Sequence, residues 1–386
     1  ENMVHSTRSV LLFVTAGAFQ IGGALNTHGP YEASHLEQGE SSSGDEWLHS
    51  KQGKPCGRFS DAELNQNAVI WVTNTVPAYA LCVRRGNVVS DEVIRSGRWP
   101  DCDVLPVLMR KFAGRRASAG TASRPPLYVD VGANIGACSL LMAAHGYRVI
   151  GFEPLLGNYH AIVAAYNANI FAPGVDVRLV NAGTSDKHTS ATLYVNHGNP
   201  GNAIVGPNDG SLPPDVLAGG GLKDYSTSTI KLTTLDAEVH ERVAVLKMDC
   251  QGHELNALRG ARRLIERYGV DVIKMEFAPS WLGYADDDAL PGEERSRTLE
   301  RRAHKQGRAL LELLVRQNYT IFMEPWSSLG KQRPGRDLGK PGRADLGEPF
   351  LLSQYDEFFE GLMHHHLFPE PFTDLIAIHR SIAIDD

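Results

Sequence analysis

The stretch LYVDVGANIGACSLLMAAHGYRVIGFEP, residues 127–154, decides the fold class of this 386-residue chain. An apolar run ends at Asp130, a glycine turn and a helix-like segment follow, and a second apolar run ends at Glu153. Gly132 and Gly136 let the backbone turn tightly, and the helix after them presents unpaired N–H groups. An acid after the second strand can accept hydrogen bonds from both hydroxyls of a ribose. The stretch therefore predicts half of a nucleotide site, for a ligand with an adenosine-like ribose.

The glycine spacing separates two kinds of nucleotide site. Dinucleotide sites carry G-x-G-x-x-G, whereas Gly132 is followed here by Ala133 and Asn134, and the next glycine is Gly136. Asp130 stands two residues ahead of the first glycine. This spacing lacks the usual pyrophosphate-binding pattern. A plain strand-to-helix turn is the alternative interpretation of the glycines taken alone.

The D-x-G-x-N-x-G form of this turn resembles motif I of class I S-adenosylmethionine (SAM) methyltransferases. Further blocks resemble the FkbM family of methyltransferases and follow in that family's order: VDVGANIG (129–136), GFEP (151–154), NAGTSD (181–186), TIKLTTLD (229–236) and LKMDCQGHELNALRGA (246–261). With a closing FTDLIAIHRS (372–381), the resemblance spans about residues 80–381.

The resemblance implies SAM as the cofactor and assigns residues to its parts. Glu153 is expected to hold the ribose, the loop from Asp130 to face the methionine half, and Asn181 to lie near the adenine. The expected cofactor-binding residues are Asp130, Gly132, Ala133, Asn134, Gly136, Glu153, Pro154, Asn181 and Ala182.

Methyl transfer to a hydroxyl needs in-line alignment and removal of a proton. Asp249, His253 and Glu276 are expected nearest the transferred methyl. Capping of the following helix is the structural alternative for Asp249 and for His253. Gln251 stands where the family block, usually K-x-D-x-E-G-x-E, has an acid. If that acid is the base, or holds the base in place, the enzyme is slow, altered or inactive.

Apolar runs and 3.6-residue spacing lay out the whole domain. Strands are predicted at 127–131, 148–152, 175–180, 244–249, 270–277, 319–324 and 374–379, and helices at 136–146, 156–169, 253–268 and 298–317. This alternation indicates an α/β, doubly wound, Rossmann-like sheet of seven strands, with the ligand beyond the carboxyl ends of the strands. The methyltransferase resemblance implies that the last two strands form an antiparallel hairpin.

The rest of the chain divides by composition. Residues 1–30 are an apolar N-terminal segment, residues 31–55 a predicted flexible tether, residues 56–125 an accessory region, and residues 126–386 the methyltransferase domain with exposed loop insertions at 187–228 and 327–349. The accessory region is either a lid over the cofactor end or a cover for the sheet. The first insertion is a candidate part of the acceptor pocket.

The uncharged run at residues 10–25 is shorter than the ~20 residues that span a bilayer. A membrane anchor, a signal-peptide core and a buried helix all stay open for it. We therefore expect a membrane-associated protein, in the secretory-pathway lumen or an organelle. A net charge of −7 argues against nucleic acid as a partner.

The five cysteines do not fix a compartment. One disulfide among Cys56, Cys82 and Cys102, with one thiol left over, would fit an oxidising compartment, but the pairing stays open. Cys138 and Cys250 are expected to be buried thiols. No metal site is expected, because the consecutive histidines at 364–366 diverge in direction.

The sequence therefore predicts a SAM-dependent methyltransferase that methylates an oxygen of a sugar, glycan or small natural product. The alternative is a catalytically inactive, methyltransferase-like subunit of a membrane-associated protein assembly. A nicotinamide-dependent oxidoreductase shares the ribose acid but lacks the glycine spacing.

Overall fold

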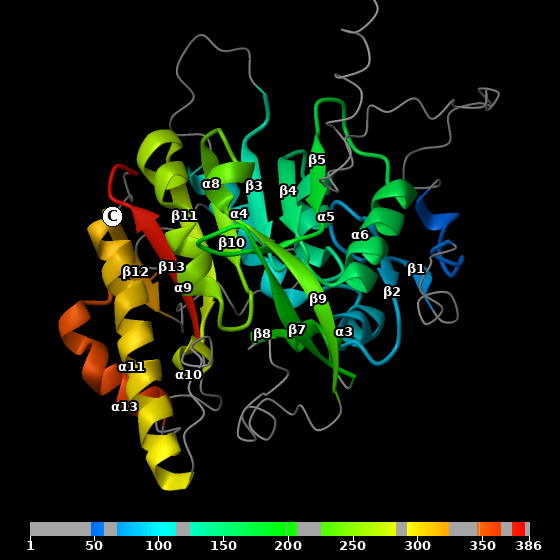
Figure 1. Cartoon of the computed structure of the whole chain (residues 1–386). Coiled ribbons are helices and arrows are strands. Elements are labelled where there is room, and N and C mark those ends of the chain that lie inside the picture. Colours follow the sequence, from blue (N-terminus) through cyan, green and yellow to red (C-terminus); the bar gives the residue numbers. More distant parts are fainter. Residues whose placement is uncertain are drawn as a thin grey trace, which may run out of the picture.

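A single seven-stranded sheet organises the chain (Figure 1). The structure, a computed structural model, describes residues 48–57, 68–112, 124–197, 199–206, 225–282, 292–323, 346, 348–363 and 373–382. The strand order across the sheet is β12-β13-β11-β10-β3-β4-β5. The strands are β3 (Leu127–Val131), β4 (Arg148–Phe152), β5 (Val177–Val180), β10 (Val243–Met248), β11 (Val270–Phe277), β12 (Tyr319–Met323) and β13 (Thr373–His379).

The directions of the strands confirm the predicted fold class. Strands β5, β4, β3, β10 and β11 are parallel, whereas β13 runs antiparallel to both β11 and β12. All residues of β3, β4 and β10 are buried, as expected of parallel strands covered on both faces. The predicted strand limits differ from the observed ones by at most two residues.

Helices cover both faces of this sheet. One hydrophobic core joins α4 (Val104–Phe112), α5 (Ala137–Ala144) and α6 (Leu156–Ala168) to it. The other core includes α9 (Glu254–Arg259), α11 (Gly292–Arg316) and α13 (Tyr355–Met363). In Figure 1, α11 and α13 lie beside β12 at one edge of the sheet.

The predicted helix 253–268 is divided in two. Helix α9 ends before Gly260, where an added Cβ would lie 1.9 Å from the backbone oxygen of Ser185. A π-helical segment, Leu264–Tyr268, follows. The carboxylate of Asp236, in α8 (Leu235–Glu238), accepts hydrogen bonds from the N–H groups of Arg263 and Leu264 at its start. Close backbone contact and a new cap therefore divide one apolar pattern into two elements.

The accessory region shares its core with the main sheet. It contains β1 (Val69–Val72), β2 (Ala80–Val83) and α3 (Val88–Ser96), besides α4. The side-chain amide of Asn169 bonds both backbone groups of Ala80, at 2.8 and 3.0 Å, which fixes β2 to the end of α6. In the part of the chain that the structure describes, this region covers the sheet and contributes no residue to the cleft at its edge.

The tether prediction is wrong for residues 48–55. Leu48 is buried, and Gly53 and Lys54 exchange backbone hydrogen bonds with Ile70 of β1. Residues 1–47, which include the apolar run at 10–25, lie outside the described residues. Among the helices described, none combines the length and apolar character needed to cross a membrane.

Two disulfides correct the expected cysteine pattern. Cys56 pairs with Cys82, and Cys102 pairs with Cys138, with Cα–Cα distances of 5.8 and 5.1 Å. Cys138 was expected to be a thiol, but the 3₁₀ turn Pro100–Cys102 packs against the first turn of α5 and brings the two sulfur atoms together. Cys250 is free.

The insertion 187–228 is not simply an exposed loop. Its described residues contribute β7 (Thr189–Asn196), β8 (Ile204–Gly206) and the first part of β9 (Tyr225–Thr233) to a second sheet, which β6 (Gly183–Thr184) completes in the order β6-β9-β7-β8. Ala191, Leu193 and Val195, at alternate positions of β7, form one hydrophobic cluster with Ile230 and Leu232 of β9, as the two-residue period of a strand allows. Most of the second insertion, 327–349, lies outside the described residues.

Candidate functional site

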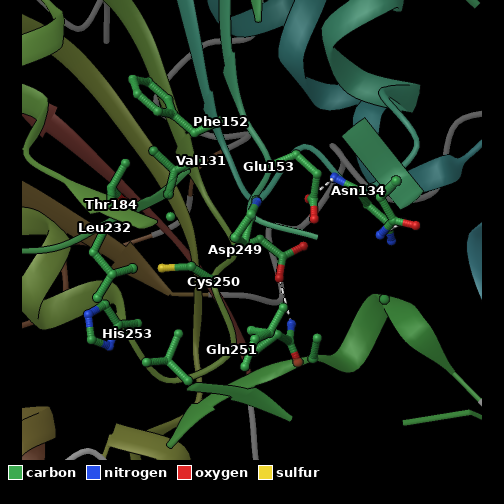
Figure 2. A pocket seen from close by; sticks show the side chains of 18 of the residues that line it. Val131, Asn134, Phe152, Glu153, Thr184, Leu232, Asp249, Cys250, Gln251 and His253 are labelled. Carbon is green, nitrogen blue, oxygen red and sulfur yellow. Dashed lines mark hydrogen bonds between the residues drawn. The ribbon is translucent and has the colours of Figure 1, made fainter. Parts of the chain in front are cut away.

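A cleft opens where β3, β4 and β10 end, beneath the second sheet. Figure 2 shows Glu153 and Asp249 projecting into it from the ends of β4 and β10, the two strands that flank β3. Its lining residues are Val131, Gly132, Asn134, Phe152, Glu153, Pro154, Asn158, Gly183, Thr184, Leu193, Pro200, Gly201, Ala203, Val205, Leu232, Asp249, Cys250, Gln251 and His253. The carboxyl ends of parallel strands are where open α/β sheets bind ligands.

The glycine loop is held by contacts inside the protein. Gly132 has φ +77°, and an added Cβ there would lie 1.8 Å from the backbone oxygen of Asp249, so β3 and β10 meet at backbone distance. The N–H groups of Gly132 and Ala133 donate to Phe152 O at 3.1 and 3.0 Å. Gly136, with φ +82°, precedes α5 and packs against Ile162. The loop is thus preformed.

Glu153 is the buried acid of the cleft, with 5% of its surface exposed. Its Oε2 accepts a hydrogen bond from Asn134 N at 2.8 Å, and its Oε1 accepts one from Leu155 N at 2.9 Å. Burial raises the pKa of Glu153 to about 8, although these two N–H donors act in the opposite direction. Each carboxylate oxygen has a second acceptor position. The group is therefore oriented and still able to accept two hydrogen bonds from a ligand.

Amide side chains fix the walls beside this acid. Asn158 donates to Asn134 Oδ1 at 3.2 Å, and Asn181 donates to the backbone oxygens of Glu153 and Pro154 at 2.9 and 3.2 Å. Asn181 and Ala182 do not line the cleft, whereas the next two residues, Gly183 and Thr184, do.

Asp130 lies beneath the glycine loop and does not line the cleft. It has no exposed surface, and its carboxylate accepts from Ser139 Oγ at 2.7 Å and from Lys247 Nζ at 3.2 Å. Lys247 also donates to Gly132 O at 3.2 Å. The expectation that Asp130 faces a ligand is therefore replaced by an indirect contribution, in which the buried pair holds the loop.

Gln251 joins two of the predicted catalytic acids. Its Nε2 donates to Asp249 Oδ1 at 2.7 Å and to Glu276 Oε2 at 3.2 Å. The Asp249 side chain is 38% exposed, and its Oδ2 lies 3.6 Å from Lys247 Nζ. Glu276 does not line the cleft. Burial, followed by the charge of Asp249, raises the pKa of Glu276 well above its usual value.

His253 lines the cleft and lies apart from Asp249 in Figure 2. Its Nε2 is 3.0 Å from Ser185 Oγ, and burial lowers the pKa of the imidazole to about 4. It makes no side-chain cap at the start of α9. The structure thus joins Asp249 and Glu276 through Gln251, whereas the hydrogen-bond partner of His253 is Ser185.

Several contributors to the site were missed by sequence reasoning. Lys247 lies within the buried strand β10. A charged residue in the otherwise apolar run before Asp249 was the available signal. Asn158 and the cleft residues at 193–205 gave no comparable signal, because they lie outside the family-like blocks. In the described part of the chain, no group of three His, Cys, Asp or Glu side chains is placed to hold a metal ion, and residues 364–366 lie outside that part.

Similarity to solved structures is low in sequence. The methyltransferase FkbM of Methylobacillus flagellatus KT is 19% identical, with 55% of this chain and 43% of that chain covered and a TM-score of 0.31. WbdD, crystallised with the kinase inhibitor LY294002, is 12% identical, with 75% and 43% covered and a TM-score of 0.34. The plantazolicin methyltransferase BpumL, in complex with SAH, is 11% identical, with 75% and 88% covered and a TM-score of 0.30. This chain therefore spans less than half the length of the first two proteins.

A family model identifies the domain. Comparison with curated proteins gave no match. The family model described as the methyltransferase FkbM domain matches residues 130–319, which run from the acid of the glycine turn to the start of β12. The match includes every residue that lines the cleft, from Val131 to His253. Residues 130–319 therefore form a methyltransferase domain of the FkbM type.

Proposed function

We propose that this domain transfers a methyl group from SAM to an oxygen of a sugar, a glycan or a small natural product. The observation that carries the proposal is the environment of Glu153. This carboxyl group is buried, is oriented by two backbone N–H groups and lines the cleft. A carboxylate with two remaining acceptor positions fits the paired hydroxyls of a ribose.

The rest of the cleft fits the same cofactor. Gly132 and Asn134 border the cleft on one side of Glu153, and Thr184, Leu193 and Leu232 offer the surface for an adenine. When bound, SAM supplies an electrophilic methyl group. Asp130 and Lys247 position the loop from below, as their contacts with each other and with Gly132 suggest.

Asp249 is the proposed base for the acceptor hydroxyl. It is partly exposed in the cleft, whereas Glu276 does not line the cleft and His253 is bonded to Ser185. As the methyl carbon bonds to the acceptor oxygen, the hydroxyl proton passes to the Asp249 carboxylate and the electron pair of the broken C–S bond stays on sulfur. Precise placement of the hydroxyl supplies most of the remaining acceleration.

We also propose that the protein resides in an oxidising compartment, such as a secretory lumen. Support comes from the pairing of four of its five cysteines in two disulfides.

Calorimetric titration with S-adenosylhomocysteine (SAH), which retains the adenosyl group and lacks the methyl, tests the function. We expect the unmodified protein to bind it, and Glu153→Ala to weaken binding by ~1–3 kcal/mol through loss of a buried hydrogen-bonding partner. Glu266→Ala, at an exposed position on the π-helical segment, is the matched control. A folded protein with no SAH binding would instead support the methyltransferase-like subunit of an assembly.

A further inference from the structure

The side chain of Gln251 is fixed by a tight turn after β10. Gln251 has φ +53° and Gly252 has φ +91°, and an added Cβ at Gly252 would lie 2.7 Å from the backbone oxygen of Trp281. Only 9% of Gln251 is exposed. The turn therefore directs this side chain between the ends of β10 and β11, where it reaches Asp249 and Glu276.

Hydrogen bonding also fixes which way the amide faces. Nε2 has two hydrogens, and one goes to each carboxyl group. The reversed amide would place Oε1 at 2.7 Å from Asp249 Oδ1, with two acceptors facing each other. Oε1 consequently points away from the carboxyl groups of Asp249 and Glu276. It is buried in the wall of the cleft and has no hydrogen-bond partner among the described residues.

An unpartnered buried carbonyl oxygen favours a ligand that donates to it. The oxygen lies beside the partly exposed carboxylate of Asp249, on the opposite side of the glycine loop from Glu153, since β3 separates β10 from β4. If Glu153 holds the ribose, this part of the cleft is free for the transferred methyl and the acceptor.

On the basis of the proposed function, we infer that Gln251 is a positioning residue for the acceptor. Its Nε2 holds Asp249 and Glu276 at a fixed separation, and its Oε1 accepts a hydrogen bond from a hydroxyl of the acceptor molecule. The amide at this position, where the FkbM pattern has an acid, is thus compatible with activity.

The charge balance explains why an amide suits this chain. A glutamate at position 251 would place a third carboxyl group within hydrogen-bonding distance of two others, and it would have to take up a proton to stay there. Gln251 makes the bridge without one, so proton uptake is left to Asp249. The charged groups around the cluster are Asp101 on the 3₁₀ turn, Lys247 on β10, Glu254 on α9, Lys274 on β11 and Asp374 on β13.

The test compares two probes that need no acceptor. Sinefungin carries an amine where SAM carries the transferred methyl, whereas SAH carries nothing there. The ratio of their dissociation constants therefore reports the groups facing the methyl position. We expect the unmodified protein to prefer sinefungin, because Asp249 and Gln251 Oε1 both accept from its ammonium. Gln251→Ala should lower that preference about tenfold, with SAH binding nearly unchanged.

Gln251→Glu separates positioning from a merely structural role. Its sinefungin preference should become pH-dependent and increase as the added carboxyl ionises, whereas the melting temperature reports folding independently. Gln317→Ala, at a half-buried site directly after α11, is the control. If SAH binds and the sinefungin preference is the same in Gln251→Ala as in the unmodified protein, the inference about Gln251 is wrong and the proposed function stands. If the unmodified protein binds neither probe, both are wrong.

Discussion

The ammonium group of Lys247 lies 3.2 Å from Oδ1 of Asp130, between two adjacent strands of the main sheet. Neither side chain has more than 7% of its surface exposed. Because Lys247 also reaches Gly132 O, the pair connects the interior of the sheet to the loop that borders the cleft. A motif acid thus contributes through the lysine on the next strand.

Breaking this pair should destabilise the whole domain. Lys247→Met leaves a buried carboxylate with Ser139 as its remaining partner, and we expect a loss of about 3–5 kcal/mol in unfolding free energy. Asp130→Asn combined with Lys247→Met should recover part of that loss, because no uncompensated charge remains. Urea denaturation measures both variants. Lys274→Met is the control, since its partner Asp374 is 23% exposed and water can solvate it. Equal losses at the two lysines would contradict the prediction.

Ligand binding should release a proton from Glu153. Its pKa is raised to about 8 in the unliganded protein, whereas ribose hydroxyls donate to the ionised carboxylate and lower that pKa. Affinity for SAH should therefore increase as pH rises toward about 8 and level off above it. Calorimetry in buffers with different ionisation enthalpies counts the released protons. Glu153→Gln should show no release, and release that persists in this variant would assign the proton to another group.

Gly132→Ala should disrupt the site through a steric clash as well as through backbone strain. The new Cβ would lie 1.8 Å from Asp249 O, so β3 and β10 must separate where the cleft forms. Gly146 provides a matched control, because it has φ +86° and nothing lies within 4 Å of its added Cβ. Gly146→Ala measures the strain of a left-handed alanine alone. We expect Gly132→Ala to lose more stability and most of its SAH binding, and similar thermal shifts in the two variants would argue against the contact.

The disulfide between Cys102 and Cys138 should stabilise the accessory region on the sheet. Replacing both cysteines by alanine is expected to lower the unfolding free energy by roughly 2–4 kcal/mol. Alkylation of the unfolded, unreduced protein followed by peptide mass spectrometry should label Cys250 alone among the five cysteines. Labelling of Cys102 or Cys138 would show that this pair does not form.

Much of the sheet could be predicted from sequence because its strands are buried on both faces. Leu127–Val131 and Arg148–Phe152 were placed without error, since each is a short apolar run between a turn and a motif. Glu153 and Asp249 follow such strands directly, so their common edge was also predictable. The fold thus followed from local hydrophobic patterns.

The features that the sequence did not predict depend on contacts between segments far apart in the chain. The pairing of Cys102 with Cys138 requires that a turn outside the motif pack on α5. The burial of Asp130 depends on Lys247, which lies 117 residues further along the chain. In the insertion, the alternation of Ala191, Leu193 and Val195 was detectable, but the surrounding glycines and prolines favoured a loop.

The cleft has walls of separate origin. Glu153, Gly132 and Asp249 come from the main sheet, whereas Leu193 and the segment Pro200–Val205 come from one hairpin-like insertion. Mutational drift in that insertion can reshape what enters the cleft without disturbing the carboxylates at the sheet edge. A change of partner molecule during evolution therefore needs no redesign of the older half of the domain.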